Sequence, residues 1–208
     1  AQPYSDVPLT QIRKTIARRL TQSIGPIPTF YLTSEVEMDR VWQARESLLA
    51  AGKREPGVAE QDVRVSFNDI IIKAVALALR QHPACNAWWQ DDHLRYWNEV
   101  HVSMAVAVEE GLLVPVVRFA DTKSLSQIAA EVKESAQKAK DKKLQPKDWE
   151  GNTFTISNLG MFGIEEFTAI INPPDSCILA IGGIAQMPVV KDGQIKIGGI
   201  NMMNLLYK

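Results

Sequence analysis

The residue types best suited to chemistry lie in the stretch 152–167, which reads NTFTISNLGMFGIEEF. Hydroxyl and apolar side chains alternate along residues 153–157, which is the period-two pattern of a strand. Ser157 ends this pattern, and Asn158 and Gly160 follow it in a loop edged by glycines. A serine hydroxyl at a strand tip can donate a hydrogen bond to an oxygen that gains negative charge in a tetrahedral intermediate. On spacing alone, however, the pattern favours a strand and tight turn that bind no ligand.

Other kinds of site have weaker support in the sequence. His82, His93 and His101 have no histidine partner four residues away and no close cysteine pair, so we expect surface or structural histidines and no metal site. The sequence contains no GxxxxGK[ST], GxGxxG or GxSxG motif, which disfavours phosphate-binding loops and a serine hydrolase elbow. Cys85 and Cys177 are far apart in the sequence. Two free thiols in a reducing compartment are favoured over a single disulfide.

The composition is ordinary for a globular protein in water. The chain has 208 residues, of which 46% are hydrophobic and 23% charged, and its formal net charge is −1. This length fits one fairly large domain or two small ones. The near-zero charge provides no general attraction to nucleic acid or to an anionic membrane. No apolar run approaches the roughly 20 residues of a membrane-spanning helix, and no signal peptide is evident, so we expect an intracellular protein.

The elements that must position Ser157 can be read from periodicity and capping signals. A helix is predicted within residues 5–28. We expect its basic side chains on a solvated or subunit-facing surface, because the aromatic side chains that would accompany a nucleic-acid-binding patch are not nearby. A strand is predicted over 29–38, a helix over 39–51 and a polar loop over 52–62. Ser66 and Asp69 form a capping-box pattern that begins a strongly apolar helix, which we expect to be buried.

The second half of the chain adds further strands and one helix. Residues 82–100 are predicted to be a connection with a turn at residues 91–92, followed by two strands within 101–120. A helix is predicted from Ser124 to about Lys142, and Asp192-Gly193 suits the tight turn of a hairpin. Helices and strands alternate without a strict βαβ repeat. We therefore predict an α/β sandwich, with helices packed on a largely antiparallel or mixed sheet.

Six stretches in order resemble the catalytic core of the dihydrolipoamide acyltransferases, the central subunits of 2-oxoacid dehydrogenase complexes. They cover nearly the whole chain and read PLTQIRKTIARRL, IPTFYLTSEVEMD, SFNDIIIKAVALAL, NEVHVSMAVAVEEGLLVPVV, GNTFTISNLGMFGIEEFTAIINPPDSCILAIGGI and PVVKDGQIKIG. The stretch SNLGMFGI is similar to the acetyl-transferring members of pyruvate dehydrogenase complexes. The resemblance identifies residues 1–208 as one acyltransferase catalytic core domain.

The resemblance implies a fold like that of chloramphenicol acetyltransferase, with a mixed sheet flanked by helices, and trimers with active sites between subunits. Trimers of this family commonly build hollow cages. The implied reaction moves an acyl group between dihydrolipoamide and coenzyme A, both substrates, with no cofactor bound in the domain. Ser157 corresponds to the family's oxyanion donor, and we expect Ser103, Asn158 and Gly160 to bind substrate. The implied partners are lipoyl domains and dehydrogenase components, in the bacterial cytoplasm or the mitochondrial matrix.

The sequence departs from the family pattern at the catalytic base, a histidine in a C-terminal His-x-x-x-Asp-Gly motif. None of the three histidines here begins such a motif, and the chain ends with INMMNLLYK. We therefore expect little or no activity from this chain. Three explanations are open: a core truncated at its C-terminus, which we favour because this ending looks unfinished; a noncatalytic, cage-forming scaffold subunit; or a base supplied by another residue or a partner subunit. A small-molecule acetyltransferase of the chloramphenicol type would need the same histidine, and its sequence fits less well.

Overall fold

The fold is taken from a computed structural model that describes residues 3–25, 27–52, 65–108 and 111–208. Within these ranges the helices are α1 (Gln11–Thr21), α2 (Asp39–Gly52), α3 (Phe67–Gln81), α4 (Leu125–Lys140) and α5 (Pro146–Trp149), with 3-10 turns η1 (Pro83–Cys85) and η2 (Gly160–Phe162). The strands are β1 (Phe30–Glu37), β2 (Ala87–Trp89), β3 (Leu94–Tyr96), β4 (Val102–Met104), β5 (Val106–Val108), β6 (Gly111–Leu113), β7 (Val116–Val117), β8 (Phe154–Asn158), β9 (Cys177–Lys191) and β10 (Gln194–Tyr207). Most of the loop predicted at 52–62 lies outside the described residues.

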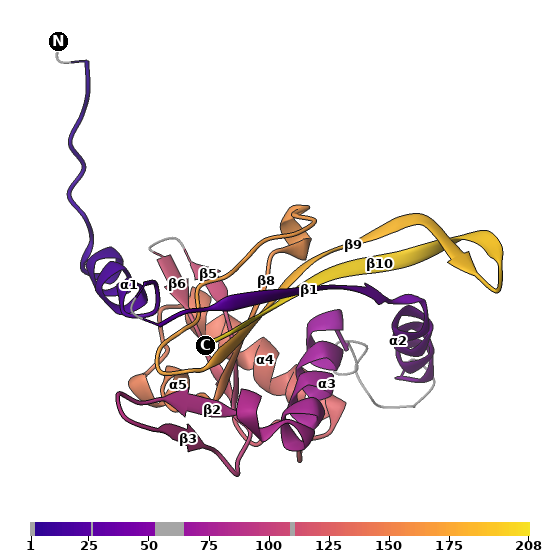
Figure 1. The fold of residues 1–208 in the computed structure, drawn as a ribbon, viewed down its shortest axis with the longest axis horizontal. Helices are drawn as coiled ribbons and strands as arrows, with labels where there is room; N and C mark the ends of the chain where they lie inside the picture. The colour runs from indigo at the N-terminus through magenta and orange to yellow at the C-terminus, as the bar shows by residue number, and fades with distance from the viewer. Residues whose placement is uncertain (1–2, 26, 53–64, 109–110) are drawn as a thin grey trace.

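A six-stranded mixed sheet forms the centre of the molecule, in the order β1-β10-β9-β8-β4-β7. Strand β8 is parallel to both of its neighbours, β4 and β9, and the other pairings are antiparallel. Two short hairpins, β2-β3 and β5-β6, lie beside it. Helices α3 and α4 cover one face of the sheet, and α1 lies at the far end from α2 (Figure 1). The predicted α/β architecture with a mixed sheet is confirmed.

Alternation along β8 separates the core from the candidate site. Phe154 and Ile156 are 2% and 1% exposed, and both belong to a hydrophobic cluster that includes Ile72 of α3 and Ile128 of α4. Successive side chains of a strand point to opposite faces, so Thr155 and Ser157 lie on the face away from α3 and α4. A second, smaller cluster includes Ile178 of β9.

Strands β9 and β10 form a long hairpin that projects beyond the body of the molecule (Figure 1). Its turn residues Asp192 and Gly193 have positive φ values of 54° and 73°, as the two-residue hairpin prediction requires. Asp39, at the start of α2, fastens the hairpin. Its Oδ1 accepts a hydrogen bond of 2.8 Å from the Gly199 amide, and its Oδ2 accepts one of 2.5 Å from Lys191 Nζ.

Several local predictions are wrong. The turn predicted at residues 91–92 is present, but the connection predicted over 82–100 also contains the β2-β3 hairpin, which flanks this turn. The two strands predicted within 101–120 are four short strands. Helix α3 has its predicted capping box but buries only one face, since Leu77 is 47% exposed. Residues 200–207 belong to β10, which is hydrogen-bonded to β1 on one side and to β9 on the other.

Candidate active site

The fold places Ser157 near the end of a central strand. Ser157 is opposite Ala180 of β9, and the neighbouring Ile156 is opposite Met104 of β4. After Asn158 the chain leaves the sheet and enters η2. The Ser157 backbone is therefore paired with β9 on one side, and the pairing of β8 with β4 ends at the residue before it.

Ser157 and Thr155 line a pocket of about 590 Å³ on the face of the sheet away from α3 and α4. The amphipathic helix α1 forms one wall, because its half-buried residues Ile12, Ile16 and Leu20 recur at helical spacing. The remaining wall includes apolar residues of the β5-β6 hairpin, of α5 and of the segment 167–170. The lining is mainly apolar, which suits an extended arm with few charges.

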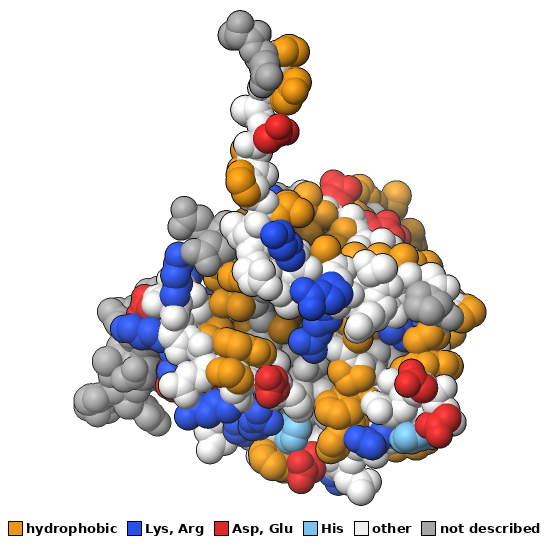
Figure 2. Space-filling model, turned by 90° about the vertical axis from the view of Figure 1, so that its left-hand side faces the viewer, with side chains coloured by type: hydrophobic (Ala, Val, Ile, Leu, Met, Phe, Trp, Pro, Cys, Tyr) orange, Lys and Arg blue, Asp and Glu red, His pale blue; other side chains and the backbone are white. Residues whose placement is uncertain are grey.

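Helix α1 can approach the β5-β6 hairpin closely because of one glycine. A Cβ atom added at Gly111 would lie 3.0 Å from Ile12 Cγ2 and 3.1 Å from Ile16 Cδ1. Gly111 also has a φ of 156°, which side chains rarely adopt. This face of the molecule carries basic side chains next to hydrophobic ones, with the N-terminal segment projecting away from it (Figure 2). The basic residues of α1 are exposed in this single chain, and a solvated surface and a subunit-facing surface would both show this exposure.

The Ser157 hydroxyl is half-buried and makes no side-chain hydrogen bond to any residue in the described part of the chain. It is therefore able to donate to an oxygen of a molecule in the pocket. Such a donor stabilises a developing oxyanion most strongly where water is excluded, and the apolar lining provides that surrounding. The geometry is suited to acyl transfer through a tetrahedral intermediate.

A buried carboxyl group lies directly behind the pocket. The Thr155 hydroxyl and the Asn152 amide each donate a hydrogen bond of 2.6 Å to Asp175 Oδ2. Asp175 is 0% exposed, and its Oδ1 has no hydrogen-bond partner in the described part of the chain. Burial raises the pKa of Asp175 to about 8, despite the opposing effects of these two hydrogen bonds and of the charges on Arg19 and Lys208. The carboxyl group therefore retains its proton near neutral pH.

The structure does not bring Ser103 into the pocket. Ser103 is 0% exposed and pairs in register with Thr155 across β4 and β8. Its Oγ lies 2.9 Å from Thr155 Oγ1 and donates a longer hydrogen bond of 3.4 Å to the Phe154 carbonyl. Ser103 thus belongs to the polar cluster around Asp175 rather than to the pocket lining.

Asn158 and Gly160 also lie outside the lining, in the turn that follows Ser157. The Asn158 amide donates to Asn68 Oδ1 at 2.6 Å, and Asn158 Oδ1 accepts from the Gly160 amide at 2.8 Å. Both polar ends of this side chain are therefore used to fasten the turn to the start of α3. The sequence pattern alone does not distinguish such a fastening residue from a ligand-binding one.

Gly160 permits close packing of η2 against β9. A Cβ atom at Gly160 would lie 2.4 Å from the Gly182 carbonyl oxygen, and one at Gly182 would lie 1.7 Å from the Glu165 carbonyl oxygen. Real Cβ atoms do not approach backbone oxygens this closely, so both glycines are required by the backbone packing. The glycines at this loop serve the turn that carries Ser157.

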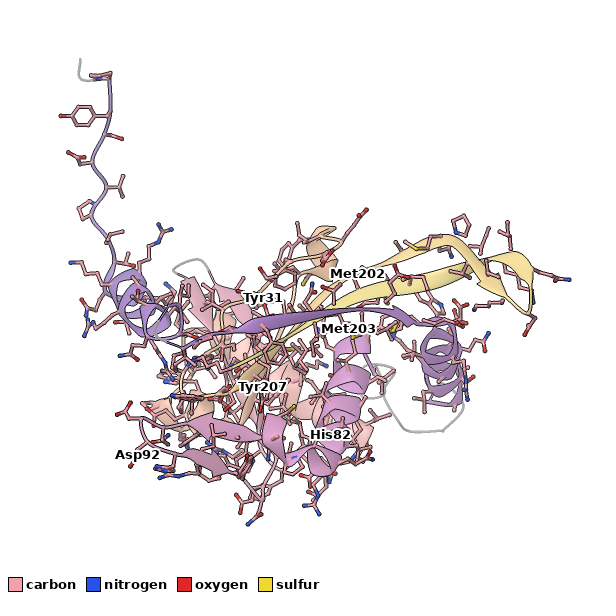
Figure 3. The ribbon with its side chains drawn as sticks, viewed as in Figure 1. Tyr31, His82, Asp92, Met202, Met203 and Tyr207 are labelled. Carbon is pink, nitrogen blue, oxygen red and sulfur yellow. The ribbon has the colours of Figure 1, made fainter. Side chains whose placement is uncertain are left out.

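No histidine of this chain lines the pocket, and all three lie in the described part. His101 is buried and fully engaged: its Nε2 lies 3.1 Å from Glu99 Oε2, and its Nδ1 accepts a hydrogen bond from the Phe119 amide. His93 contacts Asp92 at an exposed turn. His82 lies at the C-terminal end of α3, with α1 on the other side of the molecule (Figure 3).

The pocket lining includes polar residues that sequence reasoning missed. Arg19 Nη2 donates a hydrogen bond of 2.9 Å to the Pro173 carbonyl, and Arg19 is the one charged residue among the described residues of the lining. Its position three residues after Ile16 on a helix is a signal that could have found it. Thr168 and Asn172 also line the pocket, but they come from an irregular segment that offers no periodic signal.

Metal ligands do not gather in the part of the chain that the structure describes, where no group of three or more His, Cys, Asp or Glu side chains could hold an ion. Within the same ranges, no helix combines the length and the apolar character needed to cross a membrane.

The chain is similar in sequence to acyltransferases. Residues 1–207 match the family described as "2-oxoacid dehydrogenases acyltransferase (catalytic domain)". The mitochondrial dihydrolipoyllysine-residue acetyltransferase component of the pyruvate dehydrogenase complex from Caenorhabditis elegans is 49% identical over 199 residues, covering 94% of this chain and 39% of the relative. The corresponding component from Rickettsia felis is 44% identical, covering 96% of this chain and 47% of the relative. The chain thus spans less than half the length of these two relatives.

Solved structures of acetyltransferases are similar to this chain as well. The dihydrolipoamide acetyltransferase of Azotobacter vinelandii, studied for the role of a serine, a histidine and an asparagine in its catalytic mechanism, has a TM-score of 0.90 at 31% identity. It covers 98% of this chain and 82% of its own. The cubic core of a pyruvate dehydrogenase multienzyme complex matches with the same TM-score, identity and shares. A chloramphenicol acetyltransferase shares the fold, with a TM-score of 0.50 at 14% identity over 86% of this chain and 78% of its own.

Proposed function

This chain belongs to the 2-oxoacid dehydrogenase acyltransferase family, and from that premise we propose that residues 1–208 are a catalytic core domain for acetyl transfer between dihydrolipoamide and coenzyme A. Both molecules are substrates in this proposal, and the domain holds no cofactor. The acetyl group is the proposed acyl group because the Caenorhabditis elegans and Rickettsia felis relatives are named acetyltransferases of pyruvate dehydrogenase complexes.

One observation supports the chemistry above all. The Ser157 hydroxyl has no side-chain partner in the described part of the chain and lines a pocket of about 590 Å³ with mainly apolar walls. When a thiolate attacks the acetyl thioester, the carbonyl oxygen gains negative charge in the tetrahedral intermediate. The hydroxyl then donates a hydrogen bond to that oxygen. As the intermediate collapses, the carbonyl re-forms and the second thiolate leaves.

The attacking thiol needs a base, because a free thiol has a pKa of about 8.5. No His, Asp or Glu belongs to the described pocket lining, and Asp175 reaches it only through Thr155. Asp175 also holds its proton near neutral pH, so it is unsuited to accept another. We therefore propose that this 208-residue chain, assayed alone, turns over at or near the background rate. The histidine named for the Azotobacter vinelandii enzyme accords with a base of that type.

The proposed assembly is a trimer that can build a larger cage, with lipoyl domains and dehydrogenase components as partners and no nucleic acid or membrane among them. The cubic core among the similar structures supports this proposal. The edge strand β1 supports it as well, because Phe30 and Leu32 are 52% and 53% exposed beside an unpaired strand edge. The named relatives place such a domain in bacteria or in mitochondria, so the cytoplasm and the mitochondrial matrix are the two proposed compartments.

Calorimetric titration with coenzyme A tests whether the pocket admits a pantetheine arm, independently of turnover. We expect saturable binding by the parent chain. Thr168 is an exposed residue of the pocket lining, so Thr168→Trp fills the pocket with little effect on folding. Met161 is 83% exposed and lies outside the lining, so Met161→Trp is the matched control. Weaker coenzyme A binding by Thr168→Trp alone supports the proposal, whereas equal binding by all three proteins refutes the placement of the coenzyme A site in this pocket.

A noncatalytic scaffold subunit is the second candidate. The absence of His, Asp and Glu from the described pocket lining favours it. Coenzyme A binding separates the two candidates, because a scaffold has no need of it. The particle mass, measured by light scattering or mass photometry, tests the assembly that both candidates share.

A further inference from the structure

The two cysteines of this chain, far apart in the sequence, are neighbours in the structure. Strand β2 runs antiparallel to the segment before β9. The Trp89 amide donates to the Pro174 carbonyl at 2.8 Å, and the Ser176 amide donates to the Ala87 carbonyl at 2.9 Å. Continuing this register places Asn86 opposite Cys177, the first residue of β9, and the adjacent Cys85, the last residue of η1, packs against the hydrophobic cluster that contains Cys177.

Interaction between the two thiols shifts the pKa of each, and neither is in a disulfide. Cys177 is 0% exposed and belongs to the main hydrophobic cluster, whereas Cys85 is half-buried and packs against that cluster. Solvent can therefore reach one thiol of the pair while the other stays in the core. Neither thiol lines the Ser157 pocket.

The contact makes the two thiols chemically different. The hydrogen bond from Cys177 lowers the pKa of Cys85 to about 7, although burial opposes the shift. The same interaction, together with burial and the charge of the Cys85 thiolate, raises the pKa of Cys177 well above its usual range. Burial also raises the pKa of Tyr207, which lies opposite Cys177 in the sheet and is labelled in Figure 3. Cys85 is thus a partial thiolate near neutral pH, and Cys177 holds its proton.

We propose that Cys85 and Cys177 are an oxidation site, at which hydrogen peroxide converts the thiol pair to an intramolecular disulfide that a dithiol reductant reverses. The thiolate is the reactive form of a cysteine, so reaction begins at Cys85. This inference rests on the placement of the thiols and not on the proposed acetyl transfer.

The reaction has two balanced steps. The Cys85 thiolate attacks one peroxide oxygen, the O–O bond breaks, and the departing hydroxide takes up a proton to become water. Cys85 is then a sulfenic acid. The Cys177 sulfur attacks the Cys85 sulfur, an S–S bond forms, the S–O bond breaks, and the hydroxyl leaves as water with the proton of the Cys177 thiol. In total, two thiols lose two electrons and two protons, and one peroxide becomes two waters.

The experiment treats the purified chain with hydrogen peroxide at neutral pH, then removes the peroxide, denatures the protein and counts thiols with a maleimide. We expect both thiols to be lost together, the intact mass to fall by two hydrogen atoms, and a peptide to join Cys85 to Cys177. Dithiothreitol should restore both thiols. Retention of both thiols, a mass gain from added oxygen without a cross-link, or cross-links only between separate chains would overturn the proposal.

Single variants test the order of the two steps. In Cys177→Ala the second step is impossible, so Cys85 should stop as a sulfenic acid that dimedone traps. In Cys85→Ala the remaining thiol is buried and protonated, so it should react much more slowly than Cys85 does in the parent chain. Circular dichroism checks that each variant folds. Equal peroxide reactivity of the two single variants, or of folded and denatured Cys85→Ala, would contradict the assignment of Cys85 as the reacting thiol.

Discussion

Thr155 donates a hydrogen bond of 2.6 Å to Oδ2 of the fully buried Asp175. The same Thr155 lines the pocket beside Ser157, so the polar cluster around Asp175 meets the pocket at this side chain. The hydroxyl of Thr155 is fixed by Asp175, whereas that of Ser157 has no side-chain partner in the described part of the chain. Two hydroxyls on one strand face are thereby given different roles, one structural and one available to a ligand.

The pKa of Asp175 predicts how stability depends on pH. Burial raises this pKa to about 8 in the folded protein, and an unfolded Asp titrates near 4. Between these values the folded state holds a proton that the unfolded state releases, so the contribution of Asp175 to the free energy of unfolding falls as pH rises from about 4 to about 8. Asp175→Asn cannot titrate and should lose this slope.

Urea denaturation of the parent and of Asp175→Asn at several pH values measures the effect. The variant should gain stability relative to the parent as pH rises through this window, with the difference levelling off above about pH 8. Parallel pH profiles for the two proteins would show that Asp175 titrates at an ordinary pKa in the folded state.

Gly182 and Gly183 form a matched pair for testing the packing of the turn after Ser157. A Cβ at Gly182 would lie 1.7 Å from the Glu165 carbonyl oxygen, whereas one at Gly183 would find its nearest neighbour at 3.5 Å. Gly182→Ala should therefore lower the free energy of unfolding by about 1–3 kcal/mol or more, as overpacking does. Gly183→Ala should cost clearly less in the same denaturation experiment. Equal costs would mean that the turn does not pack on Gly182 as described.

Asn158→Ala separates fastening of the turn from ligand binding. The side chain hydrogen-bonds to Asn68 and to the Gly160 amide, so its loss should destabilise the fold by about 1–2 kcal/mol. Because the side chain is outside the pocket lining, the affinity of the folded variant for coenzyme A should change little. A large loss of affinity for coenzyme A with unchanged stability would instead support the substrate-binding role that the sequence suggests for Asn158.

Local signals in the sequence predicted local structure well. The Ser66–Asp69 capping box and the Asp192-Gly193 turn are present, because each depends on residues close together in the chain. The breaks within 101–120 and the β2-β3 hairpin were missed, because strands of two or three residues carry too short a pattern to be read. The segment that flanks β2 on its other side, where the Pro174 carbonyl accepts from the Trp89 amide, is distant in the sequence.

The candidate site shows the same division. The sequence pattern singles out Ser157, and the fold brings it to a pocket. The sequence pattern cannot reveal that Ser103 pairs with Thr155 inside the sheet, because this pairing depends on which strand lies beside β8. The burial of Asp175 and the position of α1 over the pocket are likewise consequences of tertiary packing.

The rate of acetyl transfer from acetyl-CoA to dihydrolipoamide, with imidazole supplied as an external base, tests the central claim most directly when parent and Ser157→Ala are compared. Without imidazole, both should remain near background. With imidazole, the parent should exceed the variant by about 100- to 1,000-fold, the usual effect of removing one oxyanion donor. Equal rates for the two proteins in imidazole would contradict the role of Ser157, and rapid turnover by the parent without imidazole would contradict the absence of a base.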